Sequence, residues 1–322
     1  MIIFIGPNRQ RSNVKRLGEH PKAPPYKYRT YTWLYRTFRL PAATYIFTGI
    51  DRLDFNERRL AGKIYRHINA AGAGFRALND PAHAKGRYAL LRGLHDAGIN
   101  RFNAYLGSNN PKPTNFPVFV RRNSLSTQPL TELLQTQTEL DDALQTLAAH
   151  GEPLDDLVII EYCAEPIQAG IFRKYSSYYL AGKTVLSWSI FEKNWMVKNG
   201  EIDIVDENVY AQEWPTVEQN SFSDVIGNVF KVANIEYGRA DFGLVDGRPQ
   251  IYEINFNPHF RTMSSSSKSP TRQKTVALVL DRHVSNLADL SLKTSRAINN
   301  IADPDITAHR WRFWRNYAPQ RY

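Results

Sequence analysis

Short apolar runs alternate with amphipathic segments along most of the chain. Runs rich in β-branched and aromatic residues predict buried strands, and they lie at residues 1–5, 43–48, 116–122 and 157–163. Apolar residues at helical spacing predict amphipathic helices over residues 57–70, 131–149, 221–233 and 273–292. Asp54 is expected to cap the first of these helices, and Asn79-Asp80-Pro81 predicts the start of another. This alternation predicts an α/β fold with a parallel sheet in a small N-terminal domain.

The most informative pattern is a pair of apolar-alternating runs, residues 241–245 and 250–255, which flank Asp246-Gly247. An Asp-Gly pair between such runs is a strong hairpin signal, because glycine adopts positive φ without a steric penalty. Side chains alternate along a strand, so Ile251, Glu253 and Asn255 are expected to share one face.

The carboxylate of Glu253 interrupts an apolar strand, and burying an unpaired charge is costly. A divalent cation held by Asp241, Glu253 and Asn255 would compensate it, because Mg²⁺ prefers hard oxygen ligands. The register tests this interpretation. A two-residue loop would place Asp241 opposite Tyr252, whereas a longer loop or a bulge would place it opposite Glu253. The alternative is an edge hairpin whose acids face water.

Asp241, followed twelve positions later by Glu-Ile-Asn-Phe-Asn-Pro, resembles the metal-binding signature of the ATP-grasp superfamily. The resemblance spans roughly residues 78–260 and is to the glutathione-synthetase-like and ribosomal-modification-like branch. It implies ATP and Mg²⁺ as cofactors and an ATP-grasp fold of four parts. These are a basic N-terminal α/β domain at 1–104, a lid subdomain at 105–170, a core subdomain with the metal site at 171–292, and a basic aromatic tail at 293–322.

The same resemblance implies roles for individual residues. Lys85 and Arg121 would contact the ATP phosphates, and Glu161 and Tyr162 would lie beside the base. The catalytic cations would be Arg173, Lys174 and Arg239, and the substrate would be held by Arg261, Ser264 and Ser265. Two features depart from the family: an arginine stands at 121 in place of lysine, and the following loop 123–129 has no glycine. Each of these roles has a structural alternative. Lys85 would be a surface lysine, Tyr162 would be a core residue, and the segment after Pro258 would be a Ser-rich linker.

Charge is concentrated at the two ends of the chain. The net charge is +10; the first fifty residues hold nine Lys and Arg against Glu19, and the last fourteen hold four Arg and no acid. This predicts an anionic small-molecule or peptide substrate reached through the N-terminal region, or else a solvated basic face. The tail, with alternating basic and aromatic residues, is expected to be a strap packed on the body, with a nucleic-acid stacking surface as the alternative.

The remaining composition narrows the class of protein. The single Cys163 excludes an internal disulfide, and no apolar run is long enough to span a membrane, so a cytoplasmic protein is expected. A homodimer is left open. The leading hypothesis is an ATP- and Mg²⁺-dependent ligase that activates a carboxylate as an acyl phosphate and joins it to an amine. The alternatives are an ATP-grasp kinase acting on a hydroxyl of a small molecule or sugar, and a nucleic-acid or anionic-polymer binding protein with a degenerate ATP site.

Overall fold

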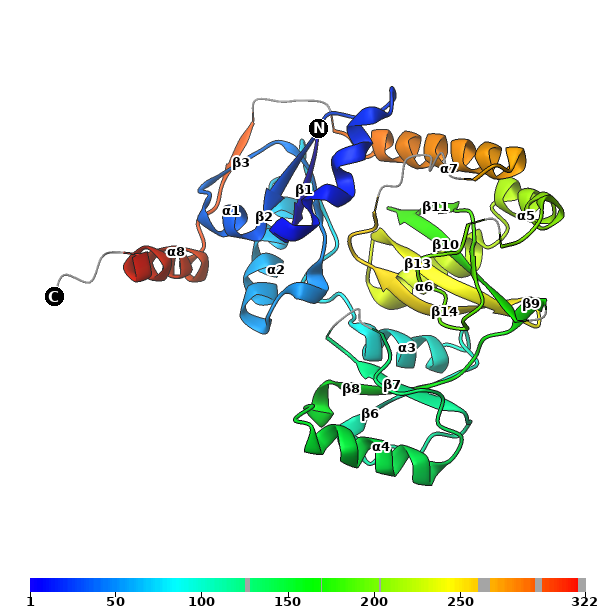
Figure 1. The fold of residues 1–322 in the computed structure, drawn as a ribbon. Coiled ribbons are helices and arrows are strands. Elements are labelled where there is room, and N and C mark those ends of the chain that lie inside the picture. Colours follow the sequence, from blue (N-terminus) through cyan, green and yellow to red (C-terminus); the bar gives the residue numbers. More distant parts are fainter. Residues whose placement is uncertain (125–127, 169, 203, 260–266, 293–296, 318–322) are drawn as a thin grey trace.

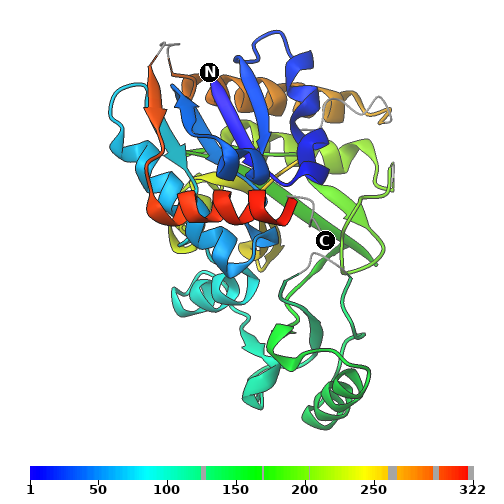
Figure 2. The same cartoon turned by 90° about the vertical axis from the view of Figure 1, so that its left-hand side faces the viewer.

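The computed structural model of the protein describes residues 1–124, 128–168, 170–202, 204–259, 267–292 and 297–317, with side chains as far as Trp311. An N-terminal part lies beside an antiparallel core, and a small lid hangs below both (Figure 1). A quarter turn leaves the lid standing apart at the bottom in the same way (Figure 2). Within the described residues, no helix combines the length and apolar character needed to cross a bilayer.

The N-terminal part is built on a four-stranded sheet in the order β2-β1-β4-β5, all parallel, as predicted. Its central strands are buried throughout, because helices and neighbouring elements cover both faces of a parallel sheet. Asp54 and Glu57 form a reciprocal capping box at the start of the helix at 55–70. The elements are β1 (Ile2–Gly6), η1 (Asn8–Glu19), β2 (Tyr26–Thr30), α1 (Tyr31–Arg36), β3 (Arg39–Pro41), β4 (Ala43–Phe47), η2 (Ile50–Arg52), α2 (Phe55–Ala70) and β5 (Phe75–Leu78).

The lid is a three-stranded antiparallel sheet in the order β6-β8-β7, covered on one face by a helix. Its own small core joins Val118 and Val120 of the sheet to Leu140 and Leu144 of that helix. The elements are α3 (Arg87–Asp96), which leads into the lid, and then β6 (Ala104–Leu106), η3 (Gly107–Asn109), β7 (Val118–Arg122), α4 (Gln137–Ala149), η4 (Leu154–Asp156) and β8 (Leu157–Glu161).

The core is an antiparallel sheet in the order β11-β10-β13-β14, with two short strands paired to β10. Two helices, 223–233 and 270–289, pack against this sheet, and the second of them (α7) lies above it in Figure 1. The elements are β9 (Pro166–Gln168), β10 (Ile171–Leu180), β11 (Lys183–Leu186), β12 (Ile190–Glu192), α5 (Glu207–Gln219), α6 (Ser223–Ala233), β13 (Tyr237–Val245), β14 (Arg248–Asn255) and α7 (Pro270–Asp289).

The C-terminal segment returns to the N-terminal part. β15 (Ile298–Asn300) pairs with β3, and α8 (Pro304–Tyr317) crosses in front of this part in Figure 2. The Arg310 side chain is buried, donates to the Tyr35 carbonyl at 2.9 Å and stacks on the ring of Phe38. Trp311, by contrast, is 68% exposed. Ile301 and Ile306 of the same segment are buried in the main hydrophobic core, so the segment packs through these two side chains and Arg310, while Trp311 faces solvent.

Two helices begin later than the sequence pattern predicts. Asn79 has φ +66° and is not helical. Its side chain instead donates to the Phe47 and Tyr237 carbonyls and accepts from the amides of Glu236 and Tyr237, which ties the parallel sheet to β13. The helix accordingly starts only at Arg87.

The second late start is in the lid. Leu134 pairs with Val118 as an isolated β-bridge, so the segment before the helix extends the sheet. Thr136 then caps α4 by accepting from the Glu139 amide. The predicted start at residue 131 is therefore six residues too early, because apolar residues at helical spacing also fit an edge segment covering the sheet.

Candidate functional site

The central hairpin has the register that a shared acidic site requires. Asp246 (φ +47°) and Gly247 (φ +72°) form a two-residue loop that pairs Val245 with Arg248. A bulge then shifts the register so that Asp241 lies opposite Glu253. The predicted pairing of the two carboxylates is confirmed, and a bulge in the second strand produces it.

The bulge also changes which residues share a face. Tyr252 is the extra residue, and it turns with Glu253 toward a cavity. Ile251 and Ile254 pack in the main hydrophobic core on the other side. The prediction that Ile251 shares the face of Glu253 and Asn255 is therefore wrong, because an inserted residue breaks the strict alternation on which it depended.

Two cavities meet at this hairpin. The first, which we call the aromatic cavity, lies between the lid and the core and holds about 100 Å³. The second, the open cleft, is bordered by the N-terminal part, the lid and the end of β14, and holds about 570 Å³. Asp241 lines the aromatic cavity, Asn255 lines the open cleft, and Glu253 lines both. Glu253 thus marks the junction between them.

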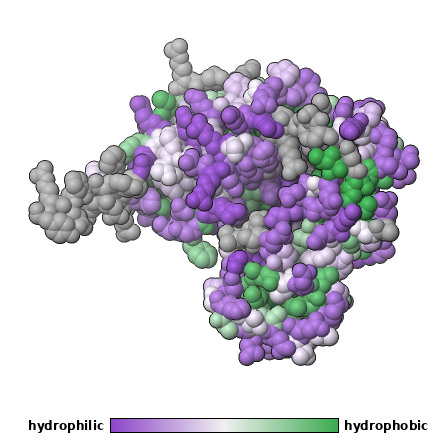
Figure 3. All heavy atoms as spheres, in the orientation of Figure 1, coloured by the Kyte–Doolittle hydropathy of each residue, from purple (hydrophilic) through white to green (hydrophobic). Residues whose placement is uncertain are grey.

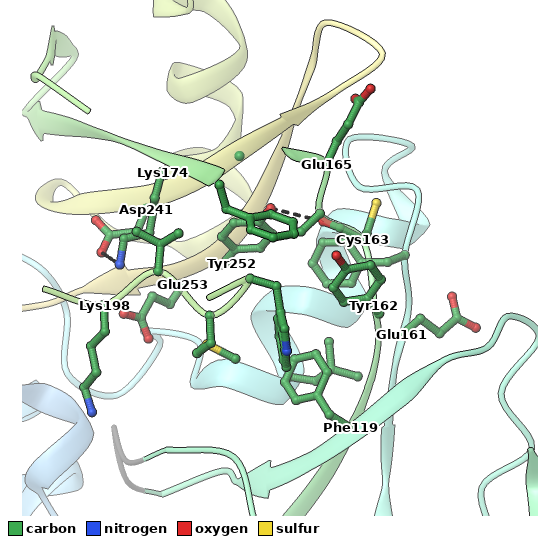
Figure 4. Close-up of a pocket in the computed structure, with 18 of the residues that line it drawn as sticks. Phe119, Glu161, Tyr162, Cys163, Glu165, Lys174, Lys198, Asp241, Tyr252 and Glu253 are labelled. Carbon is green, nitrogen blue, oxygen red and sulfur yellow. Dashed lines mark hydrogen bonds and ion pairs between the residues drawn. The ribbon is translucent and has the colours of Figure 1, made fainter. Parts of the chain in front are cut away.

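Aromatic rings form the walls of the first cavity (Figure 4). The Trp195 ring centroid lies 4.9 Å from that of Phe119 and 5.4 Å from that of Tyr162. Tyr252 donates through its hydroxyl to the Cys163 carbonyl at 3.1 Å. Trp195 belongs to a loop at 193–200 that is anchored by Glu192, whose Oε1 accepts from the amides of residues 198, 199 and 200. The sequence offered no assignment for this loop.

Cations surround the two carboxylates. Arg239 binds Asp241 with two hydrogen bonds, Nε to Oδ1 at 2.8 Å and Nη2 to Oδ2 at 2.9 Å. Lys174 Nζ lies 3.8 Å from Asp241 Oδ2. Arg87 Nη2 donates to Glu253 Oε2 at 3.3 Å. Arg121, Arg173 and Lys198 are further cations that line the aromatic cavity. Such a cluster suits a strongly anionic ligand.

Burial and neighbouring charges have opposing effects on the pKa values of Asp241 and Arg121. Burial alone would raise the pKa of Asp241, but Arg239 and then Lys174 outweigh it and hold that pKa below its ordinary value. Burial, and next the charge of the nearby Arg87, lowers the pKa of Arg121 to about 10 against the opposing effect of Glu253. At neutral pH Asp241 is therefore an anion and Arg121 a cation.

The structure brings together most, but not all, of the residues that the resemblance singled out. Arg121, Tyr162, Arg173 and Lys174 line the aromatic cavity, and Arg239 contacts Asp241. Of the adjacent pair, it is Lys174 that turns to Asp241, while Arg173 stacks on Tyr175 with its Cζ 4.7 Å from the ring centre. Arg261, Ser264 and Ser265 lie outside the described residues.

Lys85 lines the open cleft and Glu161 the aromatic cavity, but the charged ends of both side chains are directed elsewhere. Lys85 Nζ lies against Gly93 of α3 and close to α6, 3.2 Å from where a Cβ on Gly93 would stand. The Glu161 carboxylate points away from the aromatic cavity in Figure 4 and accepts hydrogen bonds from the amides of Asn103, just before β6, and Asn115, between β6 and β7. Arg87, two residues after Lys85, reaches the acidic pair instead. A basic residue beside the predicted lysine was the only sequence signal for it.

The oxygen ligands at this site fit a divalent cation only in part. Among the described residues, no three His, Cys, Asp or Glu side chains cluster as metal ligands. Glu253 and Asn255 offer a carboxylate and an amide oxygen beside the open cleft, which suits a cation that also keeps water or phosphate ligands. Asp241, by contrast, is already bound by Arg239 on both oxygens.

Comparisons with known proteins support the fold class. No protein-family model and no curated protein matches the chain. Among solved structures, the ATP-grasp ligase PsnB complexed with a minimal precursor is similar at a TM-score of 0.50 and 11% identity, over 89% of this chain and 98% of that one. VanG D-Ala:D-Ser ligase from Enterococcus faecalis gives 0.48 and 12%, over 90% and 98%. D-alanine–D-alanine ligase from Bacillus anthracis complexed with ATP gives 0.45 and 12%, over 89% and 99%.

The likeness to PsnB extends over nearly the whole of both chains. The parallel N-terminal sheet, the lid and the antiparallel core follow one another in the order that the sequence resemblance implies. The chain therefore has the ATP-grasp α/β fold, which it shares with a structure described as an ATP-grasp ligase, at an identity too low to transfer that protein's activity.

Proposed function

We propose that the protein is an ATP- and Mg²⁺-dependent ligase that activates a substrate carboxylate as an acyl phosphate and joins it to an amine. One observation carries the proposal: Glu253 lies where the aromatic cavity meets the open cleft. ATP in the first cavity would present its terminal phosphate to a carboxylate in the second. The fold adds support, since PsnB is described as a ligase.

The base of ATP would stack among Phe119, Tyr162 and Trp195, and the phosphates would lie toward the cations. The aromatic cavity, at about 100 Å³, is smaller than the roughly 300 Å³ at which small-molecule sites begin. Nucleotide binding therefore requires the loop at 193–200 to move outward, carrying the Trp195 ring with it.

The chain's own groups would promote both steps electrostatically. A bound Mg²⁺, held by Glu253 and Asn255, would neutralise charge on the transferred phosphoryl group. Arg239, Lys174, Arg121 and Arg87 would bind the equatorial phosphate oxygens as charge develops on them. Because their contacts already hold most of these cations in place, little reorganisation is needed when the substrate carboxylate attacks. The amine then attacks the acyl carbon, and phosphate leaves.

Titration of ATP into the wild-type protein tests the proposal. We expect heat of binding that requires Mg²⁺, together with a change in indole fluorescence. The Trp195→Phe variant should still bind ATP but lose most of that change, whereas Trp311→Phe, at an exposed site in α8, should keep it. Amide formation coupled to release of ADP and phosphate would then identify a ligase, and a phosphorylated hydroxyl product a kinase. Absence of ATP binding in the wild-type protein would reject the site.

The substrate is proposed to be anionic, with a peptide favoured over a nucleic acid. Arg9, Arg11, Lys15 and Arg16 are exposed along η1, beside the open cleft that Gln10 lines. The surface over the N-terminal part is largely hydrophilic in Figure 3. The cleft is lined by Asp51, Asp54, Asp155 and Asp156, which would repel a long phosphodiester chain, but also by basic residues that include Arg87. A peptide can place its one reacting carboxylate beside Arg87 in the cleft and further acids along η1.

Reversing charge on η1 tests this assignment. In Arg9→Glu/Arg11→Glu/Lys15→Glu, binding of an acidic peptide such as oligoglutamate should weaken by about tenfold or more at low salt, and the difference should shrink as salt is added. Lys231→Glu/Arg248→Glu, exposed at distant sites, is the matched control and should bind normally. Tighter binding of single-stranded nucleic acid than of oligoglutamate would contradict the assignment.

A further inference from the structure

We propose that this site holds one divalent cation, on Glu253 and Asn255, and that the Arg239 guanidinium takes the position beside Asp241 where a second cation would otherwise bind. The inference rests on the proposed function, because it concerns the same site. It decides a question that the sequence leaves open, since Asp241, Glu253 and Asn255 could in principle hold one ion or two.

Asp241 has no acceptor position left for a metal. Oδ1 accepts from Arg239 Nε at 2.8 Å and from Ser176 Oγ at 3.0 Å. Oδ2 accepts from Arg239 Nη2 at 2.9 Å and from Asn255 Nδ2 at 3.2 Å. An ionised carboxylate offers about four lone-pair positions, and these four bonds use them.

The surroundings of Asp241 exclude a cation for two further reasons. Its side chain is only 3% exposed, which leaves no room for the water ligands that Mg²⁺ retains. Lys174 Nζ lies 3.8 Å from Oδ2, so an ion at Asp241 would face two positive side chains at close range. Like charges repel strongly when water is excluded between them. The guanidinium already provides the compensating charge that a metal would bring.

Glu253 has the opposite surroundings. Its side chain is 24% exposed and borders both cavities, so water and phosphate oxygens can reach it. Its contact with Arg87 Nη2 is long, at 3.3 Å, and is easily exchanged for a shorter metal bond. A cation bound here can touch a nucleotide on one side and a substrate on the other.

Asn255 is oriented for the same ion by Asp241. Because its Nδ2 donates to Asp241 Oδ2, its Oδ1 is turned to the opposite side of the amide group. Asn255 lines the open cleft next to Glu253. Asp241 is therefore a positioning residue: it holds Arg239 and turns the Asn255 carbonyl oxygen outward, without binding the metal itself.

Counting bound Mn²⁺ by electron paramagnetic resonance, with a non-hydrolysable ATP analogue present, tests the proposal. We expect one ion per wild-type chain, one in Asp241→Asn with affinity reduced severalfold, and none in Glu253→Gln. Arg239→Met should bind two, because removing the guanidinium frees Asp241. Arg248→Met, which removes an exposed arginine at the start of β14, is the matched control and should bind one.

The outcomes separate this proposal from the function on which it rests. Two Mn²⁺ ions per wild-type chain would overturn the single-ion proposal and leave the ligase proposal standing. Retention of the ion in Glu253→Gln would also overturn it. Failure of the wild-type chain to bind the ATP analogue would overturn the proposed function itself. The wild-type count decides the matter even if Arg239→Met fails to fold.

Discussion

Replacing Glu253 with glutamine is expected to lower the rate of ATP-dependent phosphoryl transfer by about a thousandfold or more while leaving the protein folded. The carboxylate lies at the junction of the two cavities, where charge on the transferred phosphoryl group must be neutralised. Glutamine keeps the size of the side chain and can still accept from Arg87, but its neutral oxygen is a poor ligand for a divalent cation.

The measurement is release of ADP and phosphate under single-turnover conditions, with thermal unfolding recorded on the same samples. Glu165→Gln is the matched control. Glu165 lines the aromatic cavity too, but its carboxylate points away in Figure 4 and accepts from the Asp246 amide. Turnover near the wild-type rate in Glu253→Gln would reject the role of this residue in binding the metal.

The hairpin at 237–255 shows which features of the site could be predicted from the sequence. Asp-Gly predicts the turn, and the need to bring two carboxylates together predicts a longer loop or a bulge. The position of the bulge could not be predicted, because it depends on packing: Tyr252 is drawn into the aromatic cavity by its contact with the Cys163 carbonyl. That contact joins residues 89 positions apart, and local pattern carries no information about it.

The positions of the cationic residues were harder to predict from the sequence. Lys85 matched a family position, yet Arg87 reaches Glu253, because the helix begins later than predicted and shifts which side chain faces the site. The late start follows from Asn79, whose side chain is committed to Phe47 and Tyr237. Lys85 therefore lies before the helix, and only the side chains from Arg87 onward have helical spacing. The place of Trp195 in the cavity wall could not be predicted either, because an irregular loop has no hydrophobic periodicity.

Glu161 shows that a residue can match a family motif and still have a structural role, and its loss is expected to cost more stability than that of any surface acid in the lid. Its carboxylate accepts five hydrogen bonds: from the amides of Asn103, Thr114 and Asn115, from the Asn115 side chain, and from the Tyr105 hydroxyl. Removing it would leave the buried Asn103 amide and several partly buried donors without their acceptor, and a buried unsatisfied donor costs about 1–3 kcal/mol.

Glu161→Ala should therefore lower the free energy of unfolding by more than about 3 kcal/mol, measured by denaturant titration. Glu132→Ala, an exposed acid before α4, should change it by less than about 0.5 kcal/mol. Hydrogen exchange localises the effect, because the amides of Asn103, Thr114 and Asn115 should lose protection first. An unfolding free energy equal to that of the wild type would show that these donors find water instead.

The same hydrogen bonds predict how the lid responds to acid. Burial alone would raise the pKa of Glu161, but the bonds from Asn115, Tyr105 and Asn103 outweigh it and keep that pKa below its ordinary value of 4.5. A carboxyl whose pKa is lower in the folded state stabilises that state above the unfolded pKa, and the stabilisation is lost as the pH falls through the folded pKa. Wild-type stability should consequently decline below about pH 4.5, and Glu161→Gln should remove part of that decline. If Glu161 instead bound the base of ATP, this substitution would weaken nucleotide binding and leave the acid response unchanged.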